Sequence, residues 1–217
     1  MYKLIIFDLD GTLLDTIEDL ANATNHALKQ FNFPTHEVEA YRFFVGNGVN
    51  KLIERALPEA HKNPDAISMV KHEFLKYYFF HSEDCTKPYS GIPELLAKLQ
   101  LNGYKLGVAS NKMHDATSEL VKRFFPEINF ALVLGQRDGV PVKPSPDILN
   151  EIVTTAGVEK SETIFVGDTG VDAATALNAD IEFIGVLWGF RPKAELEAAG
   201  GKNFVNKPDE IFMAVKQ

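Results

Sequence analysis

The sequence predicts an α/β protein with a doubly wound parallel sheet and an all-helical domain inserted after the first strand. Short apolar runs that end in small or acidic residues indicate buried strands over residues 3–8, 104–110, 130–135, 163–168 and 182–188. Helical patterns separate the later runs, over residues 93–101, 114–125, 146–156 and 171–178. Strands that alternate with helices are typical of a parallel sheet, whose ligands bind beyond the carboxyl ends of the strands.

The stretch from about residue 16 to residue 87 interrupts this alternation, because it contains no convincing strand. Apolar residues recur there at helical spacing, in the sets Leu20, Ala23, Ala27 and Phe31, then Val49, Leu52, Ile53, Ala56 and Leu57, then residues 69–80. We therefore expect residues 1–15 and 88–217 to form the core domain and residues 16–87 to form a helical cap domain.

Composition narrows the classes of partner. The chain has 217 residues, 45% hydrophobic and 24% charged, which is the balance of a soluble globular protein. A net charge of -8 argues against a nucleic-acid backbone or an anionic membrane as partner, and no run approaches the roughly 20 apolar residues of a membrane span. The single cysteine, Cys85, cannot form an internal disulfide. We expect a cytoplasmic protein, a monomer or weak dimer, that binds a small molecule.

The motif Asp8-Leu9-Asp10-Gly11-Thr12 directly follows the first predicted strand. Because side chains alternate along a strand, Asp8 and Asp10 share the open end while Leu9 points into the protein. Two close carboxylates repel and need a cation or a shared proton, and Mg²⁺ is the usual oxygen-ligated ion at a phosphate site. The motif predicts phosphoryl transfer, with Asp8 as nucleophile and Asp10 as acid and base. The alternative is that both aspartates only end a strand and begin a turn.

A second acidic motif, Gly167-Asp168-Thr169-Gly170-Val171-Asp172, follows a later predicted strand. We expect Asp168 to complete the metal shell begun by Asp8 and Asp10. Asp172 lies one helical turn further on, and we expect it to hold the ion or a bound water from the second shell. The alternative is that Asp168 or Thr169 caps the following helix, which is compatible with metal binding.

Polar groups for the phosphoryl oxygens are expected at three further places. Ser110 and Asn111 follow the second core strand and offer a hydroxyl and an amide, and Gly11 and Thr12 follow the first. Lys143 lies in Val142-Lys143-Pro144-Ser145-Pro146, where two prolines restrict the backbone. Its charge can neutralise Asp8 and the transferring phosphoryl group together, although an ordinary lysine in a rigid loop is the alternative.

Together these motifs closely resemble the haloacid dehalogenase superfamily, whose signature elements match residues 8–12, Ser110, Lys143 and 167–172. The resemblance covers the whole chain and implies a Rossmann-like core with a helical cap inserted after the first motif. It also implies an aspartyl-phosphate intermediate and Mg²⁺ bound by Asp8, the main-chain carbonyl of Asp10, and Asp168. An aspartate at position 10 points to phosphoryl chemistry, because the dehalogenases of the superfamily have no leaving alkoxide to protonate.

Within the superfamily, three segments look like phosphoglycolate phosphatases and their relatives: residues 44–48, 110–112 and 188–191. In the cap, we expect the loop of Gly46, Asn47 and Gly48, together with Lys51 and Arg55, to contact the organic part of the substrate. The alternative is an ordinary turn between helices. Residues 188–191 are interpreted as a structural loop, since a single tryptophan after a strand usually packs.

The function predicted from the sequence is therefore hydrolysis of a small phosphorylated metabolite, of phosphoglycolate type, by a Mg²⁺-dependent phosphatase. A phosphosugar, a nucleotide or pyrophosphate would meet the same phosphoryl-binding groups. Two alternatives stay open at this point: a phosphosugar mutase of the same fold, and a non-catalytic metabolite sensor.

Overall fold

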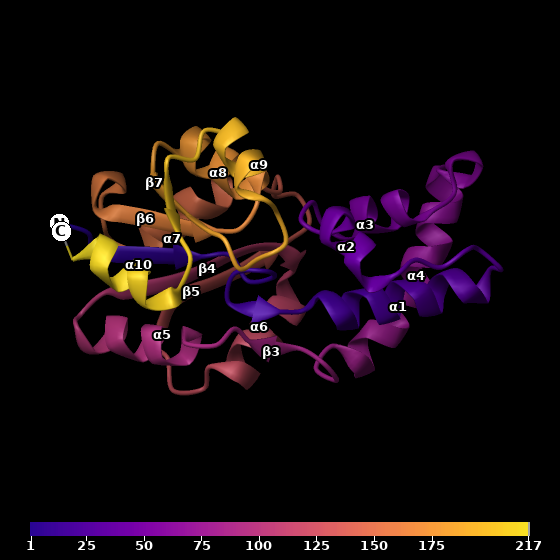
Figure 1. Ribbon diagram of the computed structural model, residues 1–217, viewed down its shortest axis with the longest axis horizontal. Coiled ribbons are helices and arrows are strands. Elements are labelled where there is room, and N and C mark those ends of the chain that lie inside the picture. Colours follow the sequence, from indigo (N-terminus) through magenta and orange to yellow (C-terminus); the bar gives the residue numbers. More distant parts are fainter. Residues whose placement is uncertain (217) are drawn as a thin grey trace. The chain divides into compact units, whose positions relative to one another are not determined.

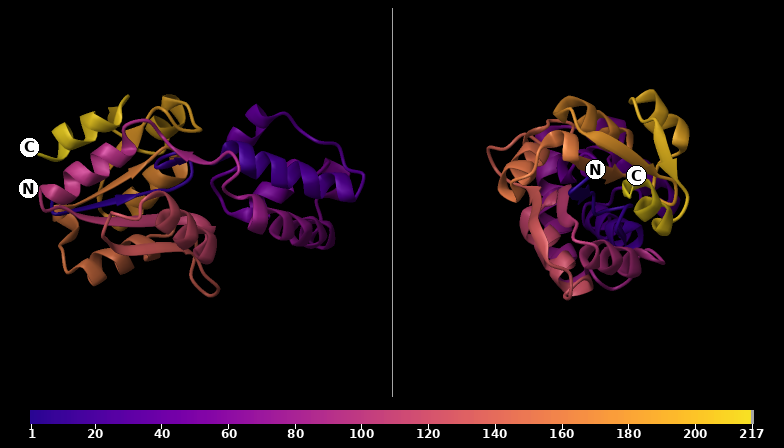
Figure 2. Two further views of the ribbon diagram at one scale, coloured as in Figure 1. Left: turned by 90° about the horizontal axis from the view of Figure 1, so that it is seen from below. Right: turned by 90° about the vertical axis from the view of Figure 1, so that its left-hand side faces the viewer.

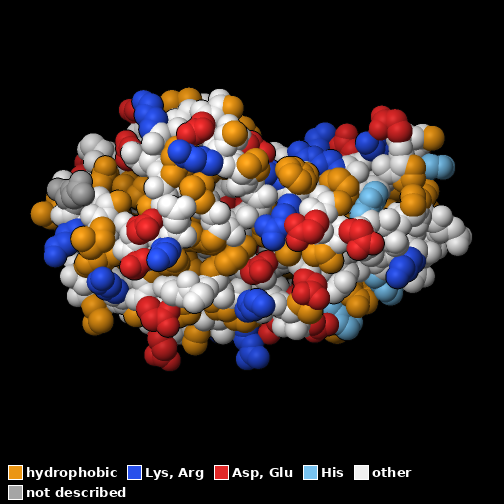
Figure 3. Space-filling view, in the orientation of Figure 1, with side chains coloured by type: hydrophobic (Ala, Val, Ile, Leu, Met, Phe, Trp, Pro, Cys, Tyr) orange, Lys and Arg blue, Asp and Glu red, His pale blue; other side chains and the backbone are white. Residues whose placement is uncertain are grey.

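The structure is a computed structural model that describes residues 1–216. The chain divides into two compact units (Figure 1): a core unit, Met1–Leu14 with Pro88–Gln217, and a helical unit, Asp15–Lys87. Among residues 1–216, no helix combines the length and the apolar character needed to cross a membrane. On the face drawn in Figure 3, basic side chains are interspersed with acidic ones. The expected cytoplasmic location and oligomeric state stay predictions.

A six-stranded parallel sheet forms the centre of the core unit, and this confirms the predicted fold class. Its strand order is β5-β4-β1-β6-β7-β8, which places β1 between β4 and β6. The strands are β1 (Leu4–Phe7), β4 (Lys105–Met113), β5 (Phe130–Gln136), β6 (Thr163–Gly167), β7 (Glu182–Val186) and β8 (Asn203–Val205). β8 was not predicted, because three residues are too few to produce a recognisable apolar run. β4 also extends beyond its predicted end, residue 110, to Met113.

Helices cover both faces of this sheet, as Figure 2 shows. They are α5 (Ile92–Leu101), α6 (His114–Phe124), α7 (Asp147–Ala156), α8 (Gly170–Ala179), α9 (Lys193–Ala198) and α10 (Pro208–Val215), with a 3₁₀ turn η2 at Lys160–Glu162. Alternate side chains of β1 enter opposite layers. Ile5 and Phe7 belong to the cluster with α5, α6 and α10, whereas Leu4 and Ile6 belong to the cluster with α7, α8 and α9.

The helical unit contains α1 (Ile17–Gln30), α2 (Val38–Phe44), α3 (Val49–Ala56), the 3₁₀ turn η1 (Glu59–His61) and α4 (Pro64–His81). α4 starts where Pro64 fixes the first helical residue and the Asn63 side chain accepts the Ala66 N–H at 3.0 Å. The short strands β2 (Leu14–Asp15) and β3 (Lys87–Pro88) pair where the chain passes between the units. The buried Asp19 carboxylate accepts bonds from the Thr86 N–H and hydroxyl, at 2.8 and 2.7 Å.

Candidate active site

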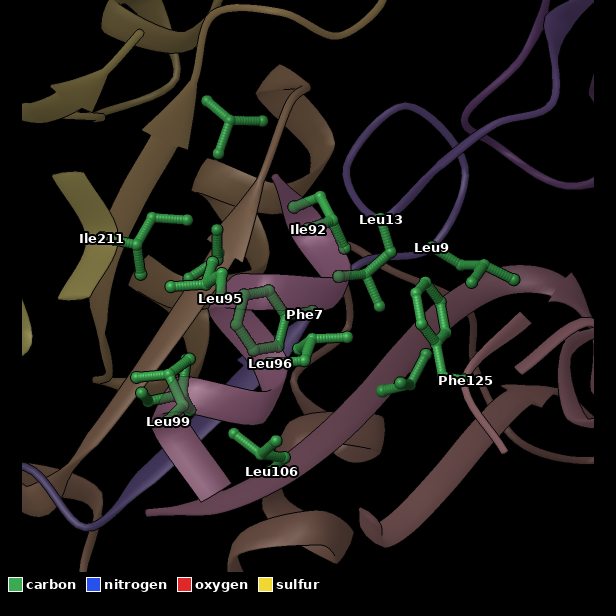
Figure 4. Close-up of a cluster of buried hydrophobic side chains, with 14 of the residues drawn as sticks. Phe7, Leu9, Leu13, Ile92, Leu95, Leu96, Leu99, Leu106, Phe125 and Ile211 are labelled. Atoms are coloured by element: carbon green, nitrogen blue, oxygen red, sulfur yellow. The ribbon is translucent and has the colours of Figure 1, made fainter. Parts of the chain in front are cut away.

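The first motif forms a loop anchored in the apolar core. Leu9 and Leu13 are fully buried and lie among the side chains of the α5 layer (Figure 4). The Leu9 carbonyl accepts the N–H groups of Leu13 and Leu14, both at 3.0 Å, which closes the loop. Burial of these two leucines holds the loop while Asp8 and Asp10 stay at the end of β1.

Strand pairing then brings two distant aspartates together. β1 and β6 lie side by side in parallel register, with Phe7 opposite Val166, and the Asp8 N–H donates to the Val166 carbonyl at 2.9 Å. Asp168 follows β6 by one residue, and Asp172 lies in the first turn of α8. Carboxylate oxygens of Asp8, Asp168 and Asp172 lie within 4.8 Å of one another, and all three residues are buried. The structure thus assembles an acidic cluster from two motifs about 160 residues apart in the sequence.

Lys143 partly balances the charge of this acidic cluster. Its ammonium lies 2.9 Å from Oδ1 of Asp8, 2.7 Å from Oδ1 of Asp172 and 2.9 Å from the Ala109 carbonyl. The residue is only 2% exposed. Its backbone is fixed by the Asn111 side chain, which accepts the Lys143 N–H at 2.8 Å and donates to the Lys143 carbonyl at 3.0 Å. A lysine with three buried acceptors is held in place and is no ordinary surface lysine.

The electrostatics of the acidic cluster favour a bound cation. Burial, with the Asp172 carboxylate adding to it, raises the pKa of Asp8 to about 7, although the Lys143 ammonium opposes the rise. Burial and the Asp172 and Asp8 carboxylates also raise the pKa of Asp168 well above its ordinary value. Burial alone would lower the pKa of Lys143, but its contacts with Asp172 and Asp8 raise it. One ammonium therefore leaves negative charge uncompensated, and the oxygen donor set suits a hard divalent cation.

The Asp168 carboxylate is held by two loops. The Thr12 hydroxyl donates to Oδ1 at 3.0 Å, and the Phe190 N–H donates to Oδ2 at 2.7 Å. The Trp188 indole N–H donates to the Thr12 carbonyl at 3.1 Å, which ties the two loops together. Thr12 was expected to bind phosphate, and its hydroxyl has Asp168 as its partner in the structure. The interpretation of residues 188–191 as a structural loop agrees with these contacts.

Glycines allow this close packing, and sequence reasoning missed one of them. Gly11 has a φ of +86°, and a Cβ built on it would lie 2.3 Å from Oδ2 of Asp168. A Cβ on Gly189 would lie 2.3 Å from Cβ of Asp168 and 2.5 Å from the Gly11 carbonyl oxygen. In the sequence, Gly189 is marked only by its position directly after a predicted strand. The structure explains the glycine, because its loop approaches Asp168 too closely for a side chain to fit.

The alternative of helix capping is also realised at α8. The Thr169 N–H and hydroxyl donate to Oδ2 of Asp172, at 3.1 and 2.6 Å, while the Asp172 N–H donates to the Thr169 hydroxyl at 3.3 Å. This capping box fixes the first turn of α8. Since Lys143 occupies the other carboxylate oxygen, both oxygens of Asp172 have protein partners.

Asp10 lies in the loop that follows β1, and Ser110 lies in the last part of the neighbouring strand β4. Asp10 is not a member of the acidic cluster in the described chain, and both of its carboxylate oxygens face the Lys112 ammonium, at 3.2 and 3.3 Å. The buried Ser110 hydroxyl accepts the Lys112 N–H at 3.2 Å. Within the Ser110-Asn111-Lys112 segment, Ser110 therefore bonds to its neighbour Lys112, while Asn111 contacts Lys143 and Lys112 contacts Asp10.

The expected specificity residues occupy one segment of the helical unit. Gly46 and Gly48 have positive φ, and Gly48 precedes the first residue of α3. The Arg55 guanidinium donates to the Phe44 carbonyl at 2.8 Å and to Oδ1 of Asn47 at 2.7 Å. Lys51 pairs with Glu54 at 2.5 Å. Arg55 thus braces the loop that carries the two glycines.

Comparison with known proteins identifies the family. The haloacid dehalogenase-like hydrolase family matches residues 5–186, and the chain belongs to this family. Phosphoglycolate phosphatase of Mesorhizobium japonicum is 32% identical over 192 residues, 86% of this chain and 83% of that protein. The enzyme of that name from Vibrio parahaemolyticus is 31% identical over 218 residues, 98% and 96% of the two chains. A crystal structure of a protein from Lactobacillus delbrueckii subsp. bulgaricus, provisionally named phosphoglycolate phosphatase, matches with a TM-score of 0.93 and 33% sequence identity. The match covers 99% of this chain and 98% of that chain.

These similarities confirm the resemblance seen in the motifs, and they define the class of enzyme. The chain is a phosphoric monoester hydrolase, similar to phosphoglycolate phosphatases. A non-catalytic sensor is accordingly disfavoured.

Replacement of Gly189 by alanine tests the packing around Asp168. The added methyl must displace either Asp168 or the Gly11 loop, so we expect phosphatase activity to fall about 100-fold, since misplacement of a reacting group by about 1 Å has this effect. Phosphate release and the melting temperature measure the outcome. Gly170→Ala is the control, because its methyl would meet only side chains, of Glu195 and Ala199, at 3.2 Å or more. Equal activity of the two variants would contradict the assignment.

Proposed function

We propose that the protein is a Mg²⁺-dependent phosphatase that hydrolyses a small phosphomonoester of phosphoglycolate type through a phosphoenzyme at Asp8. The observation that carries this proposal is the buried contact of Lys143 with Asp8 inside the acidic cluster of Asp8, Asp168 and Asp172. A carboxylate beside a buried ammonium and a cation site is arranged to accept a phosphoryl group.

Asp8 is the nucleophile of this proposal. The Leu9 N–H and the Lys143 ammonium both donate to Oδ1, at 2.7 and 2.9 Å, which leaves Oδ2 to attack phosphorus. A bond from Oδ2 to phosphorus forms while the bond from phosphorus to the ester oxygen breaks. Lys143 reduces the repulsion between the carboxylate and the anionic ester, because it stays charged next to both.

Asp10 is the acid and base. It donates a proton to the leaving ester oxygen as the phosphoenzyme forms. It then takes a proton from the water that attacks phosphorus, which breaks the bond to Asp8 and releases inorganic phosphate. Its position two residues after Asp8, in the loop that follows β1, supports this role.

A divalent ion fits the remaining charge. We propose that Asp8, Asp168 and the main-chain carbonyl of Asp10 hold Mg²⁺, with Asp172 in an outer position because its oxygens are occupied by Lys143 and Thr169. When bound, Mg²⁺ would neutralise charge on the phosphoryl oxygens.

Other predicted phosphate ligands divide into two groups. The Ser110 hydroxyl is the side-chain group that we propose to contact a phosphoryl oxygen. The Thr12 hydroxyl donates to Asp168, and the Asn111 amide donates to the Lys143 carbonyl. Gly11 permits the turn, so these three residues shape the site.

The names of the relatives support phosphoglycolate or a similar phosphomonoester as substrate. We propose that the Gly46–Gly48 loop contributes to substrate choice through its main chain, and that Arg55 and Asn47 hold this loop in shape. Lys51 remains a proposed contact for an anionic substrate group.

Asp8→Asn tests the nucleophile. We expect Mg²⁺-dependent phosphate release to fall by about 10⁴-fold or more, because an amide cannot form the phosphoenzyme. The melting temperature should be unchanged or higher, since the neutral side chain relieves repulsion within the acidic cluster. Asp138→Asn, in an exposed loop, is the control and should retain full activity. Substantial turnover by Asp8→Asn would refute the assignment.

A panel of phosphorylated metabolites tests the substrate class. With Mg²⁺ present, we expect phosphoglycolate to give the highest kcat/KM, ahead of phosphosugars, nucleotides and pyrophosphate. Free phosphate and organic products are both measured. An isomeric phosphosugar formed with little free phosphate would instead support the mutase.

The raised pKa values predict how Mg²⁺ stabilises the protein. Protonated Asp8 and Asp168 favour the folded state, and this stabilisation is complete below the ordinary pKa of 3.8. The contribution of Asp8 is lost as pH rises through its raised pKa of about 7, and that of Asp168 is lost as pH rises through its own raised pKa. Mg²⁺ binds the ionised carboxylates. The increase in melting temperature on adding Mg²⁺ should therefore be larger at pH 8 than at pH 5, at matched ionic strength. An equal increase at both pH values, or one retained in Asp168→Asn, would contradict binding at the acidic cluster.

A further inference from the structure

We propose that Lys112 is a positioning residue that holds the Asp10 carboxyl group in the orientation needed for proton exchange with the leaving oxygen. The proposal rests on the phosphatase function proposed above. It assigns a role to a lysine distinct from Lys143, on a different segment and with a different carboxylate partner.

Lys112 contacts both carboxylate oxygens of Asp10, and the pair is largely buried. The Lys112 ammonium lies 3.2 and 3.3 Å from the two oxygens of Asp10. The side chains of Lys112 and Asp10 are only 5% and 12% exposed. An ion pair with so little solvent is screened less than a surface pair, and contact with both oxygens restricts rotation of the carboxyl group.

The backbone of Lys112 is itself fixed, which limits the positions that its ammonium can take. Its N–H donates to the Ser110 hydroxyl at 3.2 Å. Gly135 of β5 packs so closely that an added Cβ would lie 2.5 Å from the Lys112 carbonyl oxygen. The pairing of β4 with β5 also shifts register between Ala109 and Met113, which ends the regular alternation of side chains. In this irregular segment Asn111 contacts Lys143 and Lys112 contacts Asp10, while the Ser110 hydroxyl accepts the Lys112 N–H.

The two lysines divide the carboxylates between them. Lys143 contacts Asp8 and Asp172, whereas Lys112 contacts Asp10. An ammonium is a donor only, and it can donate to an oxygen of either a carboxylate or a neutral carboxyl group. Lys112 can therefore keep Asp10 in place both when Asp10 acts as acid and when it acts as base.

Leaving groups of different basicity separate positioning of the acid from other roles. Phenyl, para-nitrophenyl and dinitrophenyl phosphate share a ring and lack an anionic organic group, but their phenolates need protonation to decreasing degrees. For Lys112→Met, we expect kcat/KM to fall about 10-fold or more with phenyl phosphate and less than about 3-fold with dinitrophenyl phosphate. Asp10→Asn should show the same trend more strongly, and adding Lys112→Met to it should cause little further loss.

Controls separate this role from folding and from substrate binding. Lys122→Met removes an exposed lysine on α6 and should leave the whole series unchanged. Lys112→Arg keeps a cation, so we expect it to be more active with phenyl phosphate than Lys112→Met. If Lys112→Met does not fold, Lys112→Arg is compared with the wild type in its place.

Four outcomes overturn the proposal. An equal loss across the series, or a rise in KM alone, would assign Lys112 to substrate binding or to general structure. A loss that adds fully to that of Asp10→Asn would remove the connection with Asp10. If the wild-type protein hydrolyses neither these esters nor any metabolite of the panel with Mg²⁺, the proposed function fails, and this proposal fails with it.

Discussion

Crowding of three buried carboxylates is the constraint on which the rest of the site depends. Asp8, Asp168 and Asp172 lie within 4.8 Å of one another, and one buried ammonium, that of Lys143, faces two of them. Burial, together with the charge of the neighbouring carboxylates, raises the pKa of Asp8 and Asp168, and the uncompensated negative charge makes the cluster receptive to a cation. Such an arrangement reduces the stability of the protein by itself, so the surrounding structure must hold it in place.

The apolar core provides this support. Leu9 and Leu13 are buried in the layer beneath the first loop, while Asp8 pairs through its backbone with β6. Gly11 and Gly189 let two loops approach Asp168 more closely than side chains would allow, and Thr12 and Trp188 link these loops. The position of each carboxylate is therefore set by packing and backbone bonds as well as by its own charge.

The last residues of β4 determine the positions of both lysines. Asn111 holds the backbone of Lys143, and its neighbour Lys112 contacts Asp10. A shift in strand register at this point turns consecutive side chains toward different partners, where a regular strand would alternate them between two faces. A short irregular segment thus connects the charge balance of the acidic cluster with the surroundings of Asp10.

The sequence by itself determined the alternation of strands and helices, the helical stretch after the first strand, and the placement of Asp8 and Asp168 directly after strands, because these features are written in local periodicity. It did not predict β8, α9 or α10, whose short lengths carry little periodic signal. It predicted Asp10 as a metal ligand, through its main-chain carbonyl, and Thr12 as a phosphate ligand, but it did not predict that their side chains contact Lys112 and Asp168. Only the tertiary structure decided these partners, since a motif specifies residue types and spacing but not which donor reaches which acceptor between segments more than 100 residues apart.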